Sequence, residues 1–139
     1  MIQKFFDLKI STNGQKLYEF TNNTLEWILK NKFQNGIVNI SIQHTSASLI
    51  VQENADPDVQ KDLLNYFDKL VPMNSKLYIH TTEGKDDMPA HIKSALTNSQ
   101  ISLSIKNGEL LLGTWQGLYL FEHRLSPHNR TIVHHFVGD

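Results

Sequence analysis

The sequence predicts a single α+β domain, residues 1–139, built mainly from antiparallel strands. Its 139 residues are 40% apolar and 19% charged, which is enough to bury one substantial core. Short segments alternate apolar and polar residues with the period of a strand, and about three others show helical periodicity. Strands and helices follow one another without regular alternation, so we expect a largely antiparallel sheet or two packed sheets.

In the N-terminal half, apolar residues at every second position predict a strand over residues 2–10, ending at turn-forming residues 11–14. From Thr21, capping residues precede an amphipathic helix that ends at Asn35-Gly36. Residues 37–45 alternate again, and His44 ends their apolar face. Residues 49–51 form another short apolar run.

In the C-terminal half, Asp56-Pro57 predicts the start of a second amphipathic helix, which runs to about Pro72. A candidate strand follows at residues 77–80, and a polar loop leads into a third helix at Pro89. Asn107-Gly108 predicts a tight hairpin between strands at residues 101–105 and 110–112. Two further strands are expected at residues 118–121 and 131–137, for a total of six to eight.

Residues 118–121 are apolar on both faces, which hints at a partner subunit in so small a domain. The formal net charge is −1 and the basic residues are scattered, so we expect no binding to nucleic acid. The N-terminal residues lack the apolar core of a signal peptide, and no apolar run reaches membrane-spanning length. Cysteine is absent, so any metal would bind His, Asp or Glu, and we expect a cytoplasmic protein.

The first polar segment follows the strand that ends near His44. His44 precedes the hydroxyls of Thr45, Ser46 and Ser48, and such a set can hold a phosphate or position a general acid or base. The alternative is a hydrogen-bonded histidine beside a turn, with Asp56 only capping the second helix.

The second polar segment, residues 83–91, holds three carboxylates, an ammonium and an imidazole. Carboxylates favour Mg²⁺, whereas His91 with a second imidazole such as His80 or His44 favours Zn²⁺. The alternative is that the acidic residues stabilise the start of the third helix. Adjacent Asp86 and Asp87 cannot both cap, so one is available for another role.

The third segment contains Trp115 and Gln116 between two glycines, where a ligand can approach the backbone closely. The indole of Trp115 can form one side of a pocket that binds a flat ring. The alternative is that Trp115 is an ordinary core residue. Glu122 and Arg124 end the apolar strand. Arg124 suits a bidentate phosphate contact, and the alternative is a surface ion pair with Glu122.

Four motifs, in this order, carry a resemblance to a known family: HTSASL, QENADPDV, EGKDDMPAHIKSAL and NGELLLGTWQGLYLFEHR, followed by the closing Gly138-Asp139. The chain resembles the YjbQ-like proteins, which are described as secondary thiamine-phosphate synthases. The resemblance spans nearly the whole chain. It implies a compact α+β fold with β-sheets packed in a sandwich-like arrangement, and a homotrimer whose sites lie near subunit boundaries.

The resemblance also implies an activity that couples a pyrimidine pyrophosphate to a thiazole phosphate with release of pyrophosphate. The residues expected to act in catalysis are His44, Asp87, His91, Gln116, Glu122 and Arg124. Those expected to bind substrate are Thr45, Ser46, Ser48, Asn54, Asp86 and Trp115. A divalent metal, Mg²⁺ or Zn²⁺, is expected at His44, His80 and His91.

Two alternatives remain open at this point. The physiological reaction can be a different transformation of a phosphate ester or pyrophosphate, with thiamine-phosphate synthesis as a side activity. The chain can instead form a trimer that binds a metal or metabolite without turnover. In each case the expected partners are small phosphorylated metabolites.

Overall fold

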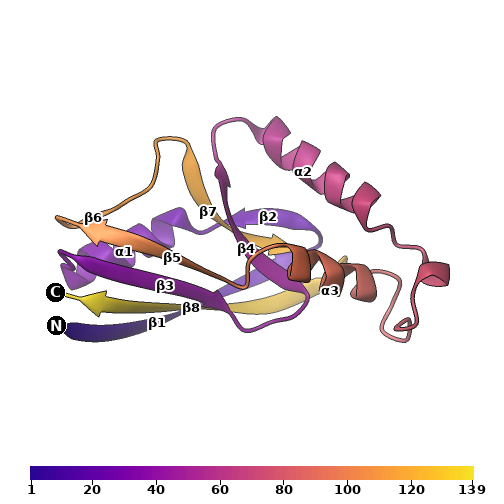
Figure 1. Cartoon of the computed structure of the whole chain (residues 1–139), viewed down its shortest axis with the longest axis horizontal. Coiled ribbons are helices and arrows are strands. Elements are labelled where there is room, and N and C mark those ends of the chain that lie inside the picture. The colour runs from indigo at the N-terminus through magenta and orange to yellow at the C-terminus, as the bar shows by residue number, and fades with distance from the viewer.

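The computed structural model describes residues 1–139 and contains two antiparallel sheets that pack face to face (Figure 1). The larger sheet has the order β1-β8-β3-β5-β6, formed by β1 (Ile2–Asn13), β8 (Pro127–Gly138), β3 (Gly36–Ile42), β5 (Gln100–Lys106) and β6 (Glu109–Leu110). The smaller sheet has the order β2-β7-β4, formed by β2 (Lys16–Glu19), β7 (Gln116–Glu122) and β4 (Ala47–Glu53). The predicted α+β class with mostly antiparallel sheets is confirmed.

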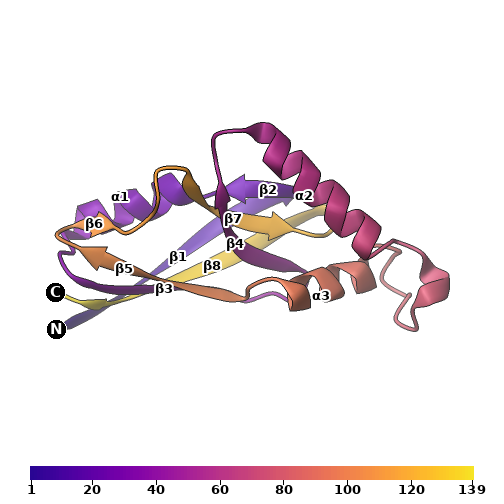
Figure 2. The same ribbon diagram turned by 45° about the horizontal axis from the view of Figure 1, so that its top comes forward.

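Three α-helices complete the fold: α1 (Thr21–Asn31), α2 (Pro57–Leu70) and α3 (Asp87–Leu96). Figure 2 shows α2 running along the upper side of the smaller sheet, while α3 lies near the ends of β3 and β5. A short 3₁₀ helix, Ser75–Leu77, lies on the segment that joins α2 to α3. None of these helices has both the length and the apolar stretch needed to cross a membrane.

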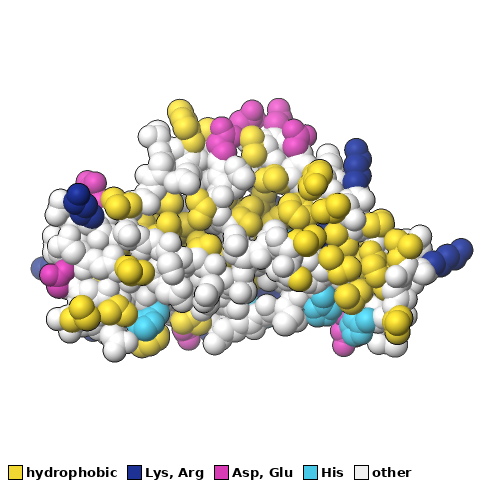
Figure 3. Space-filling view, viewed as in Figure 1, with side chains coloured by type: hydrophobic (Ala, Val, Ile, Leu, Met, Phe, Trp, Pro, Cys, Tyr) yellow, Lys and Arg dark blue, Asp and Glu magenta, His cyan; other side chains and the backbone are white.

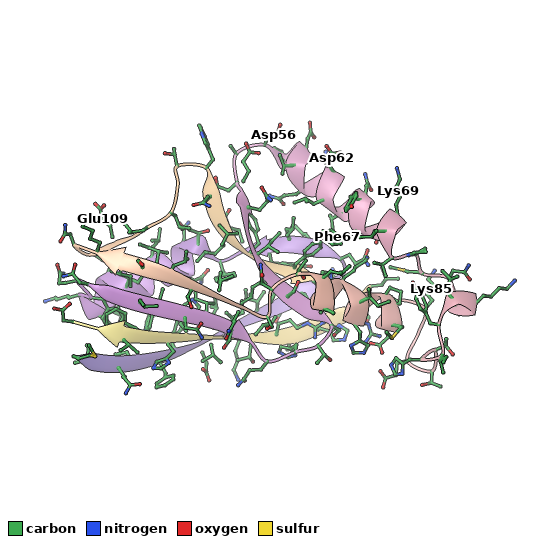
Figure 4. All side chains as sticks on the ribbon, in the orientation of Figure 1. Asp56, Asp62, Phe67, Lys69, Lys85 and Glu109 are labelled. Carbon is green, nitrogen blue, oxygen red and sulfur yellow. The ribbon has the colours of Figure 1, made fainter.

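Strand β7 is buried on both faces because one face packs against the larger sheet and the other lies under α2. Leu118 and Leu120 belong to the main core between the sheets, whereas Tyr119 and Phe121 pack under α2. The ring of Phe67 meets that of Phe121 edge to face at 5.4 Å. Figure 4 shows Phe67 on the sheet side of α2 and Lys69 pointing away. The apolar character that hinted at a partner subunit is therefore explained within one chain.

Two predicted local signals are confirmed. The Asp56 carboxylate accepts a hydrogen bond from the backbone N–H of Asp58 at 2.9 Å and caps α2. Asn107 and Gly108 both have positive φ, 52° and 81°, as a two-residue turn with a matching twist requires. This turn joins β5 to β6 and fixes their register.

Several elements differ from the prediction: β1 and β8 extend into the predicted turns at residues 11–14 and 126–129, and β3 ends at Ile42. Strand β2 was not predicted, because its four residues are too short to show a clear alternation. The strand predicted at residues 77–80 is wrong. No strand runs beside this segment to complete a ladder, and Ile79 is fully exposed. Helix α3 begins at Asp87, two residues before Pro89, since the first turn of a helix has no N–H bond for proline to remove.

His134 on β8 is a polar group inside the apolar core. Its Nε2 lies 2.8 Å from Oγ1 of Thr24, and the rings of Phe6 and Trp27 pack around it. Burial lowers the pKa of His134 to about 4. The neighbouring His135 points to the opposite face and stacks on Phe5, as the alternation of a strand predicts.

The low pKa of His134 predicts a loss of stability as the pH falls. Between pH 6.5 and 5 the unfolded chain binds a proton at His134 that the folded chain excludes, so the free energy of unfolding falls by about 1.4 kcal/mol per pH unit from this residue. Urea denaturation across this range measures the slope. His134→Gln should reduce it by about one proton, and an unchanged slope would contradict a neutral buried His134.

Candidate metal centre

The acidic loop and the first turn of α3 bring four potential ligands together. Asp87 and His91 are four residues apart, so they lie on one face of α3. Gly84, with φ of 108°, lets the preceding loop fold back toward the helix. This turn brings His80 and Glu83 to the same place. Figure 3 shows histidine and acidic side chains side by side at the surface in the region of α3.

The Asp87 carboxylate is at the centre of the cluster. Its Oδ2 lies 2.7 Å from Nε2 of His80 and 3.2 Å from Nε2 of His91. A carboxylate oxygen of Glu83 lies 3.5 Å from Nε2 of His80. One ligand atom from each of the four residues lies within 4.8 Å of every other. A single cation can therefore contact all four with small movements of the side chains.

The tautomer of His91 fits a metal ligand. Its Nδ1 lies 2.9 Å from the carbonyl oxygen of Thr45, and a carbonyl only accepts, so Nδ1 carries the proton. In neutral His91 the lone pair of Nε2 then faces the Asp87 carboxylate. Two electron-rich atoms in this position need a second proton or a cation between them. A backbone carbonyl that fixes a histidine in this way is typical of metal sites.

Arg124 holds both adjacent aspartates. Its Nε donates to Oδ2 of Asp86 at 2.9 Å, and its Nη1 donates to Oδ1 of Asp87 at 2.7 Å. Its Nη2 donates to the carbonyl of Glu83 at 3.0 Å. The Arg124 side chain is 16% exposed. The structure thus gives Arg124 a positioning role, while its contact with a phosphate stays a prediction.

These contacts keep both carboxyl groups ionised. Burial acts to raise the pKa of Asp87, but the hydrogen bond from His80 and the charge of Arg124 outweigh it, so the pKa lies below its usual value. Burial likewise opposes ionisation of Asp86. The backbone N–H of Leu125 and the Arg124 guanidinium hold the pKa of Asp86 low.

The catalytic role expected for Glu122 stays a prediction, and within this chain the residue has a structural role. Glu122 is fully buried, and its carboxylate accepts hydrogen bonds from Nε and Nη2 of Arg130 at 2.7 and 2.5 Å. The hydroxyl of Thr12 and the backbone N–H groups of His123 and Arg124 also donate to it. Burial raises the pKa of Glu122, but the bonds from Arg130 and Thr12 outweigh this effect and keep it low. With five donors in place, this carboxylate has no accessible oxygen for a substrate.

The substrate contacts expected of Ser46 and Ser48 likewise stay predictions, because both hydroxyls have partners within the chain. Both residues are buried. The Ser46 hydroxyl accepts a hydrogen bond from Nη2 of Arg130 at 3.0 Å. The Ser48 hydroxyl lies 2.9 Å from Nε2 of His123 and accepts from Thr97 at 2.7 Å. These hydroxyls connect the layers of the fold.

His44, which was also expected to bind the metal, does not belong to the cluster of four potential ligands. Its Nε2 accepts a hydrogen bond from the backbone N–H of Thr131 at 3.0 Å. The proton of the neutral ring is therefore on Nδ1, which leaves no lone pair for a metal. Burial and the charge of Arg130 lower the pKa of His44, and both favour this neutral form. His44 lies instead beside the centre, in a pocket that it shares with His91 and Thr45.

Asn54, Trp115 and Gln116 do not reach the cluster within one chain. Gln116 begins β7, opposite Glu53 on β4, whereas Glu122 ends it. Six residue steps of a strand separate these ends by about 20 Å. The Trp115 side chain is 63% exposed, so it is not a core residue.

The sequence reasoning counted Glu83 among the three carboxylates of residues 83–91 but gave it no role of its own, and it did not name Arg130. Residues 83, 87 and 91 are spaced by four, and this spacing was the available signal for Glu83 as a member of the cluster. Arg130 gave no comparable signal, because it is a single basic residue just before the strand predicted at residues 131–137, whereas in the structure it lies within β8.

Comparison with known proteins gives consistent matches along the chain. The family model of the UPF0047 protein YjbQ-like family matches residues 6–139. UPF0047 protein sll1880 of Synechocystis is 48% identical over 132 residues, which is 95% of this chain and 90% of that protein. UPF0047 protein YjbQ of Escherichia coli O157:H7 is 42% identical over 75% of each chain. A YjbQ/UPF0047-family crystal structure from Clostridium acetobutylicum covers 96% of this chain and 99% of its own, with 32% identity and a TM-score of 0.84.

The buried ion pair predicts a large effect of Arg130→Met. The change leaves the Glu122 charge buried and unpaired, so the free energy of unfolding should fall by about 3 to 5 kcal/mol in urea denaturation. The double variant Glu122→Gln with Arg130→Met removes the stranded charge and should recover part of the loss. A loss below about 1 kcal/mol in the single variant would show that the pair is not essential to the fold.

The ligand cluster predicts tight binding of Zn²⁺, measurable by titration calorimetry. Asp87→Asn removes the charge that both imidazoles approach, and His91→Ala removes a ligand, so each should weaken binding by about tenfold or more. Asp62→Asn, on the exposed surface of α2, is the matched control and should bind like the unmodified protein. Equal affinity of all four proteins would place the metal elsewhere.

Proposed function

Because the chain belongs to the UPF0047 YjbQ-like family, we propose that it is a metal-dependent enzyme that acts on small phosphorylated metabolites. The reaction that the family resemblance implies is the formation of thiamine phosphate. The observation that carries the proposal is the Asp87 carboxylate, with one oxygen held by Arg124 and the other facing two imidazoles. The carboxylate oxygen and the two imidazole nitrogens together form a place where a cation can bind.

The proposed reaction joins the ring nitrogen of a thiazole phosphate to a pyrimidine that carries a pyrophosphate. The nitrogen forms a bond to the exocyclic carbon of the pyrimidine as the bond from that carbon to pyrophosphate breaks, and pyrophosphate leaves with the electron pair. A bound divalent metal supplies neutralisation of the charge on pyrophosphate. The residues that would hold the metal are His80, Glu83, Asp87 and His91, and Arg124 keeps Asp87 ionised.

The donor set favours Zn²⁺ or another transition metal over Mg²⁺. Two imidazole nitrogens, from His80 and His91, stand beside the carboxylates of Glu83 and Asp87. Imidazole suits Zn²⁺, whereas Mg²⁺ prefers oxygen ligands in an octahedral arrangement with several waters. Of the two metals expected from the sequence, Zn²⁺ is the better match.

We also propose that the chain forms a homotrimer in which a neighbour completes the site. Two features support this: Trp115 is exposed just before β7, at the end of the strand opposite to Glu122 and Arg124, and α2, α3 and the segment between them carry exposed apolar side chains. Figure 3 shows hydrophobic side chains gathered over these elements. The exposed residues in question are Tyr66, Leu70, Leu77, Ile79 and Leu96.

A second candidate is a different phosphate-ester or pyrophosphate transformation at the same centre. Glu122, Ser46 and Ser48 were expected to serve the synthase reaction, and all three are buried and hydrogen-bonded. A simpler reaction that needs fewer groups than the synthase fits this arrangement. Binding without turnover is the third alternative.

An assay with both thiamine precursors, with Zn²⁺, with Mg²⁺ and after removal of metal by a chelator, separates these functions. We expect product with Zn²⁺, and less than about 1% of that rate for His91→Ala and Asp87→Asn, since each loses a ligand. His135→Ala, on the outer face of the larger sheet, is the control and should keep full activity.

Sedimentation should give each variant the mass of the unmodified oligomer. Undiminished product formation in both ligand variants would remove this centre from the reaction. Hydrolysis of a phosphate ester without thiamine phosphate would favour the second candidate.

A further inference from the structure

A pocket of about 360 Å³ lies beside the metal cluster, between α3 and the turn from β3 to β4. His91 belongs to both, because its ring lines the pocket while its Nε2 faces Asp87. His44 and Thr45 line the side that belongs to the turn. A molecule bound to the metal through one group can therefore place another group in this pocket.

The walls of the pocket carry no lysine, arginine or carboxylate. Apart from the two histidines, its lining consists of threonine, serine and alanine side chains. A phosphate in this pocket would meet no fixed positive charge. A metal ion bound at the neighbouring cluster would supply that charge. The pocket suits an uncharged group with polar atoms, bounded by the methyl groups of Ala47 and Ala95.

His44 lines this pocket, and one of its two ring nitrogens has no partner within the chain. Its Nε2 accepts from the backbone N–H of Thr131, so its proton is on Nδ1. Nδ1 forms no hydrogen bond within the chain. It is not a buried atom, so it is accessible to a ligand. The backbone thus fixes the tautomer, and the free N–H is the one donor of His44 that is left for a ligand.

We propose that this pocket binds the uncharged ring of a phosphorylated substrate, and that Nδ1–H of His44 donates to an acceptor such as a ring nitrogen. The phosphate of the same molecule binds at the metal centre, and for that part the inference rests on the proposed function. His44 is then a substrate-binding residue that selects for an acceptor-bearing heterocycle.

The test compares ligands of one shape that differ in a single acceptor. The probes are the three pyridylethyl phosphate isomers, 2-phenylethyl phosphate and inorganic phosphate, each titrated into Zn²⁺-loaded protein at pH 8. At least one pyridyl isomer should bind about tenfold more tightly than the phenyl compound, the usual value of one good hydrogen bond. Equal binding of all the esters, with inorganic phosphate also bound, would overturn this inference alone.

Two variants separate the two nitrogens of His44. The amide of glutamine reaches the position of Nε2, so His44→Gln keeps an acceptor for Thr131 and loses the donor to the pocket. The amide of asparagine matches Nδ1, so His44→Asn keeps the donor and loses the bond to Thr131. We expect the preference for the pyridyl compound to vanish in His44→Gln and to persist in the less stable His44→Asn.

The reverse pattern would show that His44 has only a structural role and would overturn the inference. If neither the esters nor inorganic phosphate bind to Zn²⁺-loaded protein, the proposed function fails and this inference fails with it. Retained binding of inorganic phosphate therefore distinguishes the two failures.

Discussion

The candidate site depends on the contacts that the Asp87 carboxylate makes with Arg124, His80 and His91. Arg124 holds one oxygen, and His80 and His91 approach the other. A carboxylate at the start of a helix would ordinarily be satisfied by the free N–H groups of the first turn. Here a guanidinium fixes its orientation instead, so the oxygen that faces the imidazoles has a defined direction. The loop that carries Glu83 is held to the same guanidinium through its backbone.

The end of β7 connects this site to the rest of the fold. Glu122 pairs with Arg130 on β8 of the larger sheet, His123 contacts Ser48 on β4, and Arg124 reaches the loop before α3. Burial lowers the pKa of His123 to about 3, so this contact is made by a neutral ring. A buried ion pair adds little net stability compared with apolar packing. An arrangement of the sheets that separated Glu122 from Arg130 would, however, leave a buried charge unpaired. The three residues therefore define how the two sheets and α3 fit together.

Much of the fold could be predicted because its signals are local. Alternation gave most of the strands, and Asp56-Pro57 and Asn107-Gly108 marked a helix start and a hairpin. The errors arose where pairing decided the outcome. Residues 77–80 have the composition of a strand but no neighbouring strand, and β2 is a strand only because β7 lies beside it.

The candidate site could be predicted in part, for a related reason. His80, Asp87 and His91 follow one another closely in the chain, so their spacing pointed to shared ligation. The role of His44 depends on Thr131, which is 87 residues away, and that of Glu122 depends on a salt bridge across the sheets. Tautomers and burial are set by such distant contacts, and no local pattern reports them.

Anomalous diffraction at the zinc absorption edge, from crystals grown with Zn²⁺, tests the central claim most directly. The account predicts one strong peak per chain among His80, Glu83, Asp87 and His91, with His44 outside the coordination sphere and still bonded to the N–H of Thr131. A peak at His44, a peak at a distant site, or no peak at this cluster would contradict it.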